Sequence, residues 1–123
     1  MSQLTRWSCV AFALIASSLS HTESHADAAR GRALYDSRCV ACHSVDASLI
    51  GPSHRGVVGR KVGSVKDYEY SSALTDSKLV WDVVLLQKWL ANPGALIPGQ
   101  RMGHSVSEAK DRLDLVEYLA TLK

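Results

Sequence analysis

Cys39-Val40-Ala41-Cys42-His43 is the most informative segment of this chain. Two cysteines separated by two residues, with a histidine directly after the second, form the pattern to which a c-type haem is attached. On one turn of the chain, each thiol can reach one vinyl group of the haem, and the histidine can direct a ring nitrogen at the iron. We therefore expect one haem c, bound covalently through Cys39 and Cys42, with His43 as an iron ligand.

Other uses of these two cysteines fit the sequence less well. A disulfide or half of a zinc site would use the same thiols, but a structural zinc ion needs about four nitrogen or sulfur ligands. The only other cysteine, Cys9, lies in the leader described next. A thioredoxin-like dithiol belongs in a βαβ surrounding, and the sequence shows no β alternation. The haem interpretation is therefore preferred.

The first 26 residues have the pattern of a secretory signal peptide. Arg6 supplies a positive charge, an apolar run follows from Cys9 to about Leu19, and Ser24-His25-Ala26 offers small residues to signal peptidase. The run is shorter than the roughly 20 residues that a membrane-spanning helix needs. We expect cleavage after Ala26, a periplasmic location and a single soluble domain over residues 27–123. The formal net charge of +2 is too small and too mixed in sign for a nucleic-acid-binding protein.

Apolar periodicity predicts an all-α fold, with three main helices and long loops around the haem. The first helix runs from Ala28 to about Cys39 and leads into the haem motif. A second helix is expected over residues 82–92 and ends at Pro93. Its apolar stripe consists of Leu85, Leu86, Trp89 and Leu90.

The last helix is indicated by Ser105 with Glu108 three residues later, which is the pattern of a capping box. Leu115, Val116, Leu119 and Leu122 then follow at helical spacing. We also expect a short helix over residues 70–75 and loops over residues 44–64 and 94–103, which are punctuated by glycine and proline. A loop as long as the first of these usually wraps a functional group.

The second iron ligand decides between an electron carrier and a catalyst, because an open iron site binds gases or peroxide. Met102 is the candidate, since it is the only methionine besides Met1 and follows Pro98 and Gly99 in a loop instead of lying on a helical stripe. Two alternatives stay open. His104 could replace Met102, because imidazole is an equally good haem ligand, and a loosely held Met102 would leave a peroxide- or gas-binding site.

The residues from 27 to 123 resemble the class I cytochromes c, in particular the mitochondrial-like group that includes the bacterial cytochromes c2. The resemblance covers essentially this whole segment, with its landmarks in family order and at about the family's spacing. Besides the haem motif and Met102, these landmarks are Gly31, Tyr35, Gly51-Pro52, Gly59-Arg60, Tyr70, Trp81, Asn92-Pro93, Pro98-Gly99 and Tyr118-Leu119.

The resemblance implies roles for several residues of the haem pocket. The carbonyl of Pro52 would accept the ring N–H of His43, which orients the ligand. Hydrogen bonds to the haem propionates would come from Arg60, Tyr70 and Trp81. Such bonds would offset the cost of placing carboxylates in a pocket of low dielectric constant.

Further roles concern packing. Trp89 stands where relatives place an aromatic residue, often tyrosine, near the methionine sulfur, and Leu86, Leu90 and Ile97 would line the apolar pocket. The first and last helices would cross where Gly31 and Tyr35 pack against Tyr118.

The chain departs from the family in three places. His54 occupies a position that is commonly apolar, and we interpret it as a satisfied surface histidine. Gly94 and Ala95 replace docking lysines, and His104 replaces an aromatic residue near the exposed haem edge. Because only Arg38 and Arg101 are left near that edge, we expect a partner that is less acidic than the usual oxidase and more dependent on apolar contact.

The expected function is single-electron transfer by a His43/Met102 iron that cycles between iron(III) and iron(II), not enzymatic catalysis. The donor would be a periplasmic dehydrogenase or a bc1-type complex of a respiratory chain. The acceptor would be an oxidase, a reductase or a reaction centre, and the membrane would be reached only through such partners. As an alternative, the chain would be the dedicated acceptor or haem subunit of one periplasmic dehydrogenase, for sulfite, methanol or a similar substrate.

Overall fold

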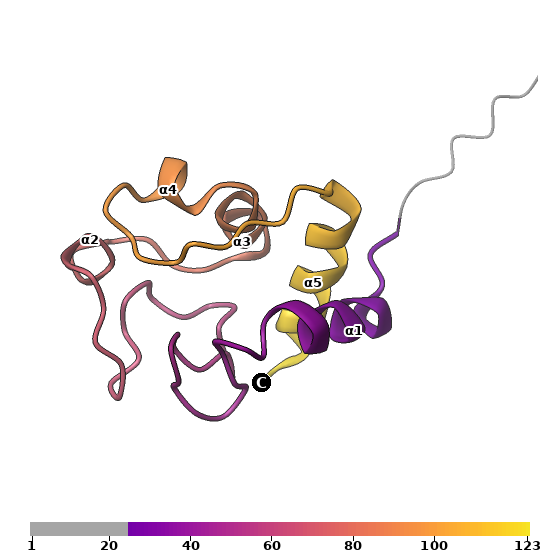
Figure 1. The fold of residues 1–123 in the computed structure, drawn as a ribbon, viewed down its shortest axis with the longest axis horizontal. Coiled ribbons are helices and arrows are strands. Elements are labelled where there is room, and N and C mark those ends of the chain that lie inside the picture. Colours follow the sequence, from indigo (N-terminus) through magenta and orange to yellow (C-terminus); the bar gives the residue numbers. More distant parts are fainter. Residues whose placement is uncertain (1–24) are drawn as a thin grey trace, which may run out of the picture.

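The structure, a computed structural model, describes residues 25–123 and contains five helices within them. In chain order these are α1 (Ala28–Arg38), α2 (Ser72–Thr75), α3 (Val83–Ala91), α4 (Pro93–Leu96) and α5 (Ala109–Thr121) (Figure 1). Between residues 25 and 123 the only β pairing is an isolated bridge between Lys61 and Val80. The predicted all-α fold is confirmed. The predicted signal peptide lies outside the described residues except for His25 and Ala26.

Helices α1 and α5 cross in close contact at one end of the molecule (Figure 1). At the crossing, a Cβ atom on Gly31 would lie 1.9 Å from the carbonyl oxygen of Asp114, so no larger residue fits there. One turn later the ring of Tyr35 packs against that of Tyr118, with 5.3 Å between the ring centroids. The expected contact between the first and last helices is confirmed.

A buried charge cluster joins the same two helices. Asp114 is fully buried and Asp111 nearly so, and Arg30 forms ion pairs with both carboxylates. Arg38 approaches Asp111 to 3.0 Å, and Lys110 approaches Asp114 to 2.5 Å. Because every buried charge has a partner, the cluster connects α1 to α5 without leaving an isolated ion in the interior.

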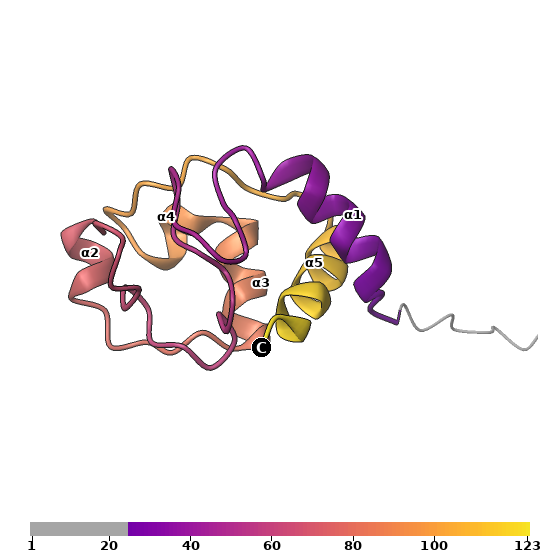
Figure 2. The same ribbon diagram turned by 90° about the horizontal axis from the view of Figure 1, so that it is seen from below.

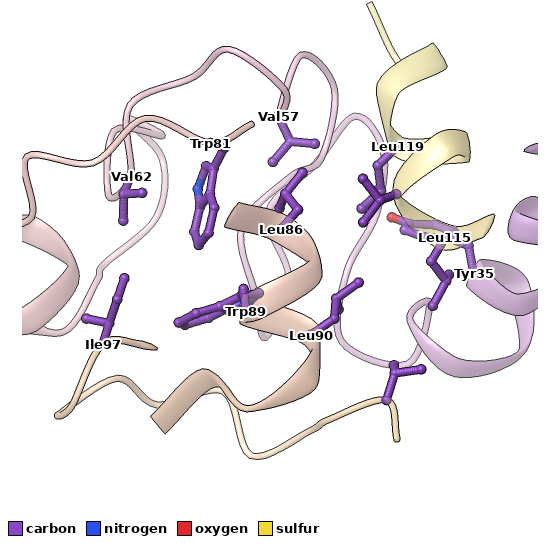
Figure 3. Packing of buried hydrophobic residues seen from close by; sticks show 12 residues of the cluster. Tyr35, Val57, Val62, Trp81, Leu86, Trp89, Leu90, Ile97, Leu115 and Leu119 are labelled. Atoms are coloured by element: carbon purple, nitrogen blue, oxygen red, sulfur yellow. The ribbon is translucent and has the colours of Figure 1, made fainter. Parts of the chain in front are cut away.

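Helix α3 supplies the centre of the apolar core and lies between the α1–α5 pair and α2 (Figure 2). Its buried side chains are Leu86, Trp89 and Leu90, three members of the predicted stripe, whereas Leu85 is half-buried. Figure 3 shows the ring of Trp81 beside Leu86 and near that of Trp89, and Leu90 on the side of α5. The core therefore connects the crossing helices to the loops on the far side of α3.

The long loops are positioned by backbone hydrogen bonds to one another. The segment before α3 runs antiparallel to residues 59–62, with bonds from Gly59 N to Trp81 O (2.7 Å), from Trp81 N to Arg60 O (2.9 Å) and from Val62 N to Leu79 O (2.9 Å). These bonds satisfy backbone groups that a buried loop would otherwise leave unpaired. They also fix the approach of the 59–62 segment to Trp81.

Helix α3 ends immediately before Pro93, as predicted, but the predictions for the segment after α3 and for the start of the last helix were wrong. Pro93 does not lead into a loop but occupies the first turn of α4, because the Asn92 side chain accepts a hydrogen bond from Ala95 N and caps a new helix. Ser105 and Glu108 form no capping box. Helix α5 starts only at Ala109, since Val106 is buried and its N–H donates to Leu90 O at 2.7 Å, which keeps this segment extended.

Within residues 25–123, no helix has the length and apolar character needed to cross a membrane.

Candidate haem site

The described residues enclose a cavity of about 520 Å³ between the haem motif, the 50–60 segment, α3 and the loop before α5. Its walls are largely apolar. They contain ten of the eleven predicted site residues, namely Cys39, Cys42, His43, Pro52, Arg60, Tyr70, Trp81, Trp89, Leu90 and Met102. The exception is Ile97, which is buried in the core beside the cavity without lining it.

The haem motif forms a single turn at the end of α1. Cys39 is the C-cap of α1, and its carbonyl accepts hydrogen bonds from Cys42 N (3.1 Å) and His43 N (2.9 Å). Both cysteines are free thiols that line the cavity. Burial raises the pKa of Cys39 to about 11. The turn therefore presents two unoxidised thiols and one imidazole to the same space, as attachment of a haem requires.

The ring of His43 is fixed at one nitrogen. Its Nδ1 atom lies 2.8 Å from the carbonyl oxygen of Pro52, which the resemblance implied. This contact leaves Nε2 as the nitrogen available to a metal. Gly51 lies so close that a Cβ atom there would stand 2.2 Å from Cε1 of His43. Burial lowers the pKa of His43, which favours the neutral form that metals bind.

His54 is not the surface histidine that the sequence predicted. Its ring stacks on that of His43, with 4.1 Å between centroids and 21° between planes. Its Nδ1 atom lies 3.0 Å from the hydroxyl of Tyr35. Burial, with smaller contributions from the charges of His43 and Arg60, lowers the pKa of His54 to about 3. The sequence held one signal for this contact, a polar residue at a commonly apolar position.

Met102 reaches the same cavity from the loop that follows α4. It is half-buried and packs against the apolar core, and its backbone N–H donates to Oε1 of Gln100. His104 also borders the cavity but is exposed to solvent. The two candidate ligands therefore differ in surroundings, since Met102 belongs to the apolar interior and His104 to the surface.

The aromatic wall next to Met102 comes from α3 and the segment before it. Trp81 and Trp89 meet edge to face, with centroids 5.3 Å apart and 63° between planes. Both rings are more than nine-tenths buried. This contact gives the cavity a rigid apolar side, and the sequence did not predict that the two tryptophans touch.

Arg60 gives a direct test of whether these residues fit a haem. Its Nη1 and Nη2 atoms donate to the carbonyls of Arg55 (3.2 Å) and Ser53 (2.9 Å). Its Nε–H is buried and has no partner among residues 25–123, and burial lowers the pKa of Arg60. A buried donor of this kind calls for an acceptor. A haem propionate is an acceptor of the required charge, so the donor set fits a haem.

These features define a class of protein: a small all-α chain that attaches one haem c through two cysteines of a single turn. Residues 28–123 match the cytochrome c family, and the chain belongs to that family. It is a class I c-type cytochrome and a monohaem electron carrier.

Named relatives agree with this assignment. The chain is 41% identical over 100 residues to cytochrome c of Euglena viridis, covering 79% of this chain and 98% of that protein. It is 44% identical over 91 residues to cytochrome c2 iso-1 of Magnetospirillum fulvum, covering 70% and 92%.

Solved structures show the same fold. Cytochrome cH from Methylobacterium extorquens superposes with a TM-score of 0.73 at 39% identity, covering 77% of this chain and 98% of that one. Ferricytochrome c2 from Rhodopseudomonas palustris superposes with a TM-score of 0.75 at 32% identity, covering 79% and 99%.

Proposed function

We propose that this cytochrome carries electrons with an iron ligated by His43 and Met102. The observation that supports it best is that one apolar cavity receives both side chains, and that the Pro52 contact leaves only Nε2 of His43 for a metal. When bound, the haem supplies one-electron chemistry between iron(III) and iron(II). Two protein ligands leave no coordination site for a substrate, so the proposed role is transfer without catalysis.

The residues around the cavity favour the reduced state. Leu86, Trp89 and Leu90 exclude water, and an apolar surrounding disfavours the additional positive charge of the ferric form. A thioether ligand is soft and favours iron(II). Both effects raise the midpoint potential, which we expect to be clearly positive.

Two matched variants separate Met102 from His104 as the ligand. We expect Met102→Ala to lose the charge-transfer band from sulfur to ferric iron and to bind carbon monoxide when reduced, because its sixth position opens. We expect His104→Ala to keep the optical spectrum of the parent. If Met102→Ala instead kept that spectrum and His104→Ala lost it, the proposed ligation would be wrong and His104 would be the ligand.

The rim of the cavity supports the proposal of an apolar docking face. Ile50 borders the cavity and is 73% exposed, its chain neighbour Leu49 is 55% exposed, and Val40 between the two haem-motif cysteines is 48% exposed. The two arginines at the rim are already engaged, Arg38 with Asp111 and Arg101 with the carbonyl of Glu69. We infer that this face binds a redox partner, such as a periplasmic dehydrogenase, bc1-type complex or oxidase, whose own face is apolar and weakly charged.

Export to the periplasm and cleavage after Ala26 complete the proposal. Asp27 would then begin the mature chain, and its side chain caps α1 by accepting hydrogen bonds from Ala29 N and Arg30 N. The backbone nitrogen of Asp27 donates to Asp114 at 2.7 Å. A free α-ammonium group at this nitrogen would face a buried carboxylate, so cleavage would preserve the capped helix. Mass spectrometry of the exported protein identifies the cleavage position.

A further inference from the structure

The imidazole of His54 stacks on the ring of His43. The two imidazoles lie nearly parallel, with their centroids 4.1 Å apart. A contact over a ring face restrains the tilt of the ring, whereas the hydrogen bond to Pro52 restrains a single atom, Nδ1. The two contacts are therefore complementary, and both are needed to fix the ring in three dimensions.

The position of His54 is itself determined by the backbone. His54 N donates to the carbonyl of Ser44 at 3.1 Å, and Arg55 N donates to the carbonyl of Val45 at 2.8 Å. These bonds join Ser44 and Val45, which follow His43, to His54 and Arg55. A displacement of His54 along the chain would break its hydrogen bond to Ser44, the residue that follows His43.

The far end of the His54 ring is fixed by α1. Nδ1 of His54 lies 3.0 Å from the hydroxyl of Tyr35, and Tyr35 is 2% exposed and packed on Tyr118 of α5. The two rings also meet edge to face, with centroids 5.6 Å apart. An apolar residue could fill this space, but it would not be tied to one orientation by a hydrogen bond.

We propose that His54 is a positioning residue that, held by the Tyr35 hydroxyl, sets the plane of the His43 imidazole from its face. This inference rests on the proposed ligation of the iron by His43. It extends the set of groups that orient the ligand from the backbone carbonyl of Pro52 to a side-chain pair that reaches the α1–α5 crossing. Groups of this kind tune a metal site without touching the metal.

The orientation of an axial imidazole has a spectroscopic signature. In a ferric low-spin haem, the plane of the ligand ring governs how the unpaired spin is distributed, and this distribution spreads the proton resonances of the four haem methyl groups. Loss of a residue that only fills space would lower stability without altering this spread. The spread therefore separates a positioning role from a packing role.

The experiment compares haem-loaded full chains that carry Tyr35→Phe, His54→Leu or both substitutions with the parent, by proton NMR of the ferric proteins. Tyr118→Phe is the matched control, since it removes a ring hydroxyl from the same aromatic cluster that forms no hydrogen bond to His54. Tyr35→Phe removes one hydroxyl and keeps the ring, so this variant alone can test the inference if His54→Leu does not fold.

We expect Tyr35→Phe and His54→Leu to shift the haem methyl resonances in the same sense, and the double variant to match His54→Leu. We expect Tyr118→Phe to reproduce the parent. Methyl resonances of Tyr35→Phe that coincide with those of the parent would overturn the inference. Failure of the ligation proposal is distinguishable, because the parent itself would then lack the resonances of a methionine bound to low-spin iron.

Discussion

Arg60 presents a buried N–H that no group of residues 25–123 accepts, and this makes it the clearest mark that a negatively charged group belongs in the cavity. Its two other donors are satisfied by the carbonyls of Ser53 and Arg55, so the guanidinium is already oriented. A side chain that is positioned before its acceptor arrives loses little conformational freedom on binding. We therefore propose that Arg60 is preorganised to bind a haem propionate.

We predict that Arg60→Gln lowers the midpoint potential, because a positive charge beside the haem disfavours the ferric state and its loss stabilises that state. The expected change is on the order of 1 kcal/mol, or roughly 40 mV for a one-electron couple. Redox titration of the haem-loaded protein measures it. Arg60→Lys keeps the charge and serves as the control, and a potential that is equal in Arg60→Gln and the parent would argue against this role.

The haem motif predicted Cys39, Cys42 and His43, because it fixes the chemistry of a short segment, whereas the other pocket residues except Met102 were implied by the resemblance to the class I cytochromes c. Cys39, Cys42 and His43 are adjacent along the chain, so their geometry follows from one turn. The stacking of His54 on His43 could not be predicted in the same way, since it depends on where the 44–45 and 54–55 segments meet. The sequence showed that His54 is a polar residue at a commonly apolar position, but it did not show that His54 contacts His43.

Helices α1 and α5 pack against each other, and the charge cluster between them makes the stability of the fold depend on pH. The direction of this dependence follows from the pKa shifts of the two buried carboxylates. Burial raises the pKa of Asp114, but hydrogen bonds from Lys110, Arg30 and the Asp27 backbone outweigh this and lower it. The pKa of Asp111 is lowered by its hydrogen bond to Arg30. A carboxyl group whose pKa is lower in the folded state stabilises the fold above the unfolded value of about 3.9.

We predict that Asp114→Asn lowers the melting temperature at neutral pH by roughly 5–10 °C, through loss of charge-assisted hydrogen bonds. The difference from the parent is expected to shrink as the pH falls below about 4, because the parent then loses the same charge. Thermal unfolding followed by circular dichroism across this range gives both values. Asp76→Asn, at an exposed residue that forms no ion pair within the described part of the chain, is the control. A difference independent of pH would contradict this account.

The bounds of α1 and α3 and the apolar stripe of α3 were predicted from local features, to within a residue at each end. The crossing of α1 and α5 at Gly31 was implied by the resemblance to the class I cytochromes c and not by apolar spacing. Helix α4 and the late start of α5 depend on tertiary contacts instead. Pro93 ends α3, and the Asn92 cap starts a new helix directly after it, whereas the burial of Val106 overrides the capping-box pattern at Ser105.

The surface around the cavity is the part of the protein that we expect a redox partner to contact. Ile50 is exposed at the rim and Arg38 is paired with Asp111, so of the two rim arginines Arg101 is the one that keeps its charge, because it donates to the neutral carbonyl of Glu69. Long-range steering depends on uncompensated charge, whereas apolar contact does not. The described surface therefore favours association that is governed by contact area.

We predict that the association rate with the physiological redox partner falls by less than about threefold between low and physiological ionic strength, whereas steered complexes show far steeper losses. Stopped-flow mixing at several salt concentrations measures this rate. Ile50→Lys is expected to weaken association, and Leu79→Lys, at an exposed apolar residue away from the cavity lining, is the control. A steep fall of the parent's rate with salt would refute the apolar docking face.

The most direct test of the central claim is an optical spectrum of the haem-loaded chain, produced with haem-maturation machinery in the periplasm, before and after reduction and under carbon monoxide. We predict a weak charge-transfer band from the Met102 sulfur to the ferric iron, and a low-spin reduced form whose spectrum carbon monoxide does not change. Absence of the band, together with rapid carbon monoxide binding at neutral pH, would contradict a His43/Met102 iron and would indicate an open, ligand-binding haem.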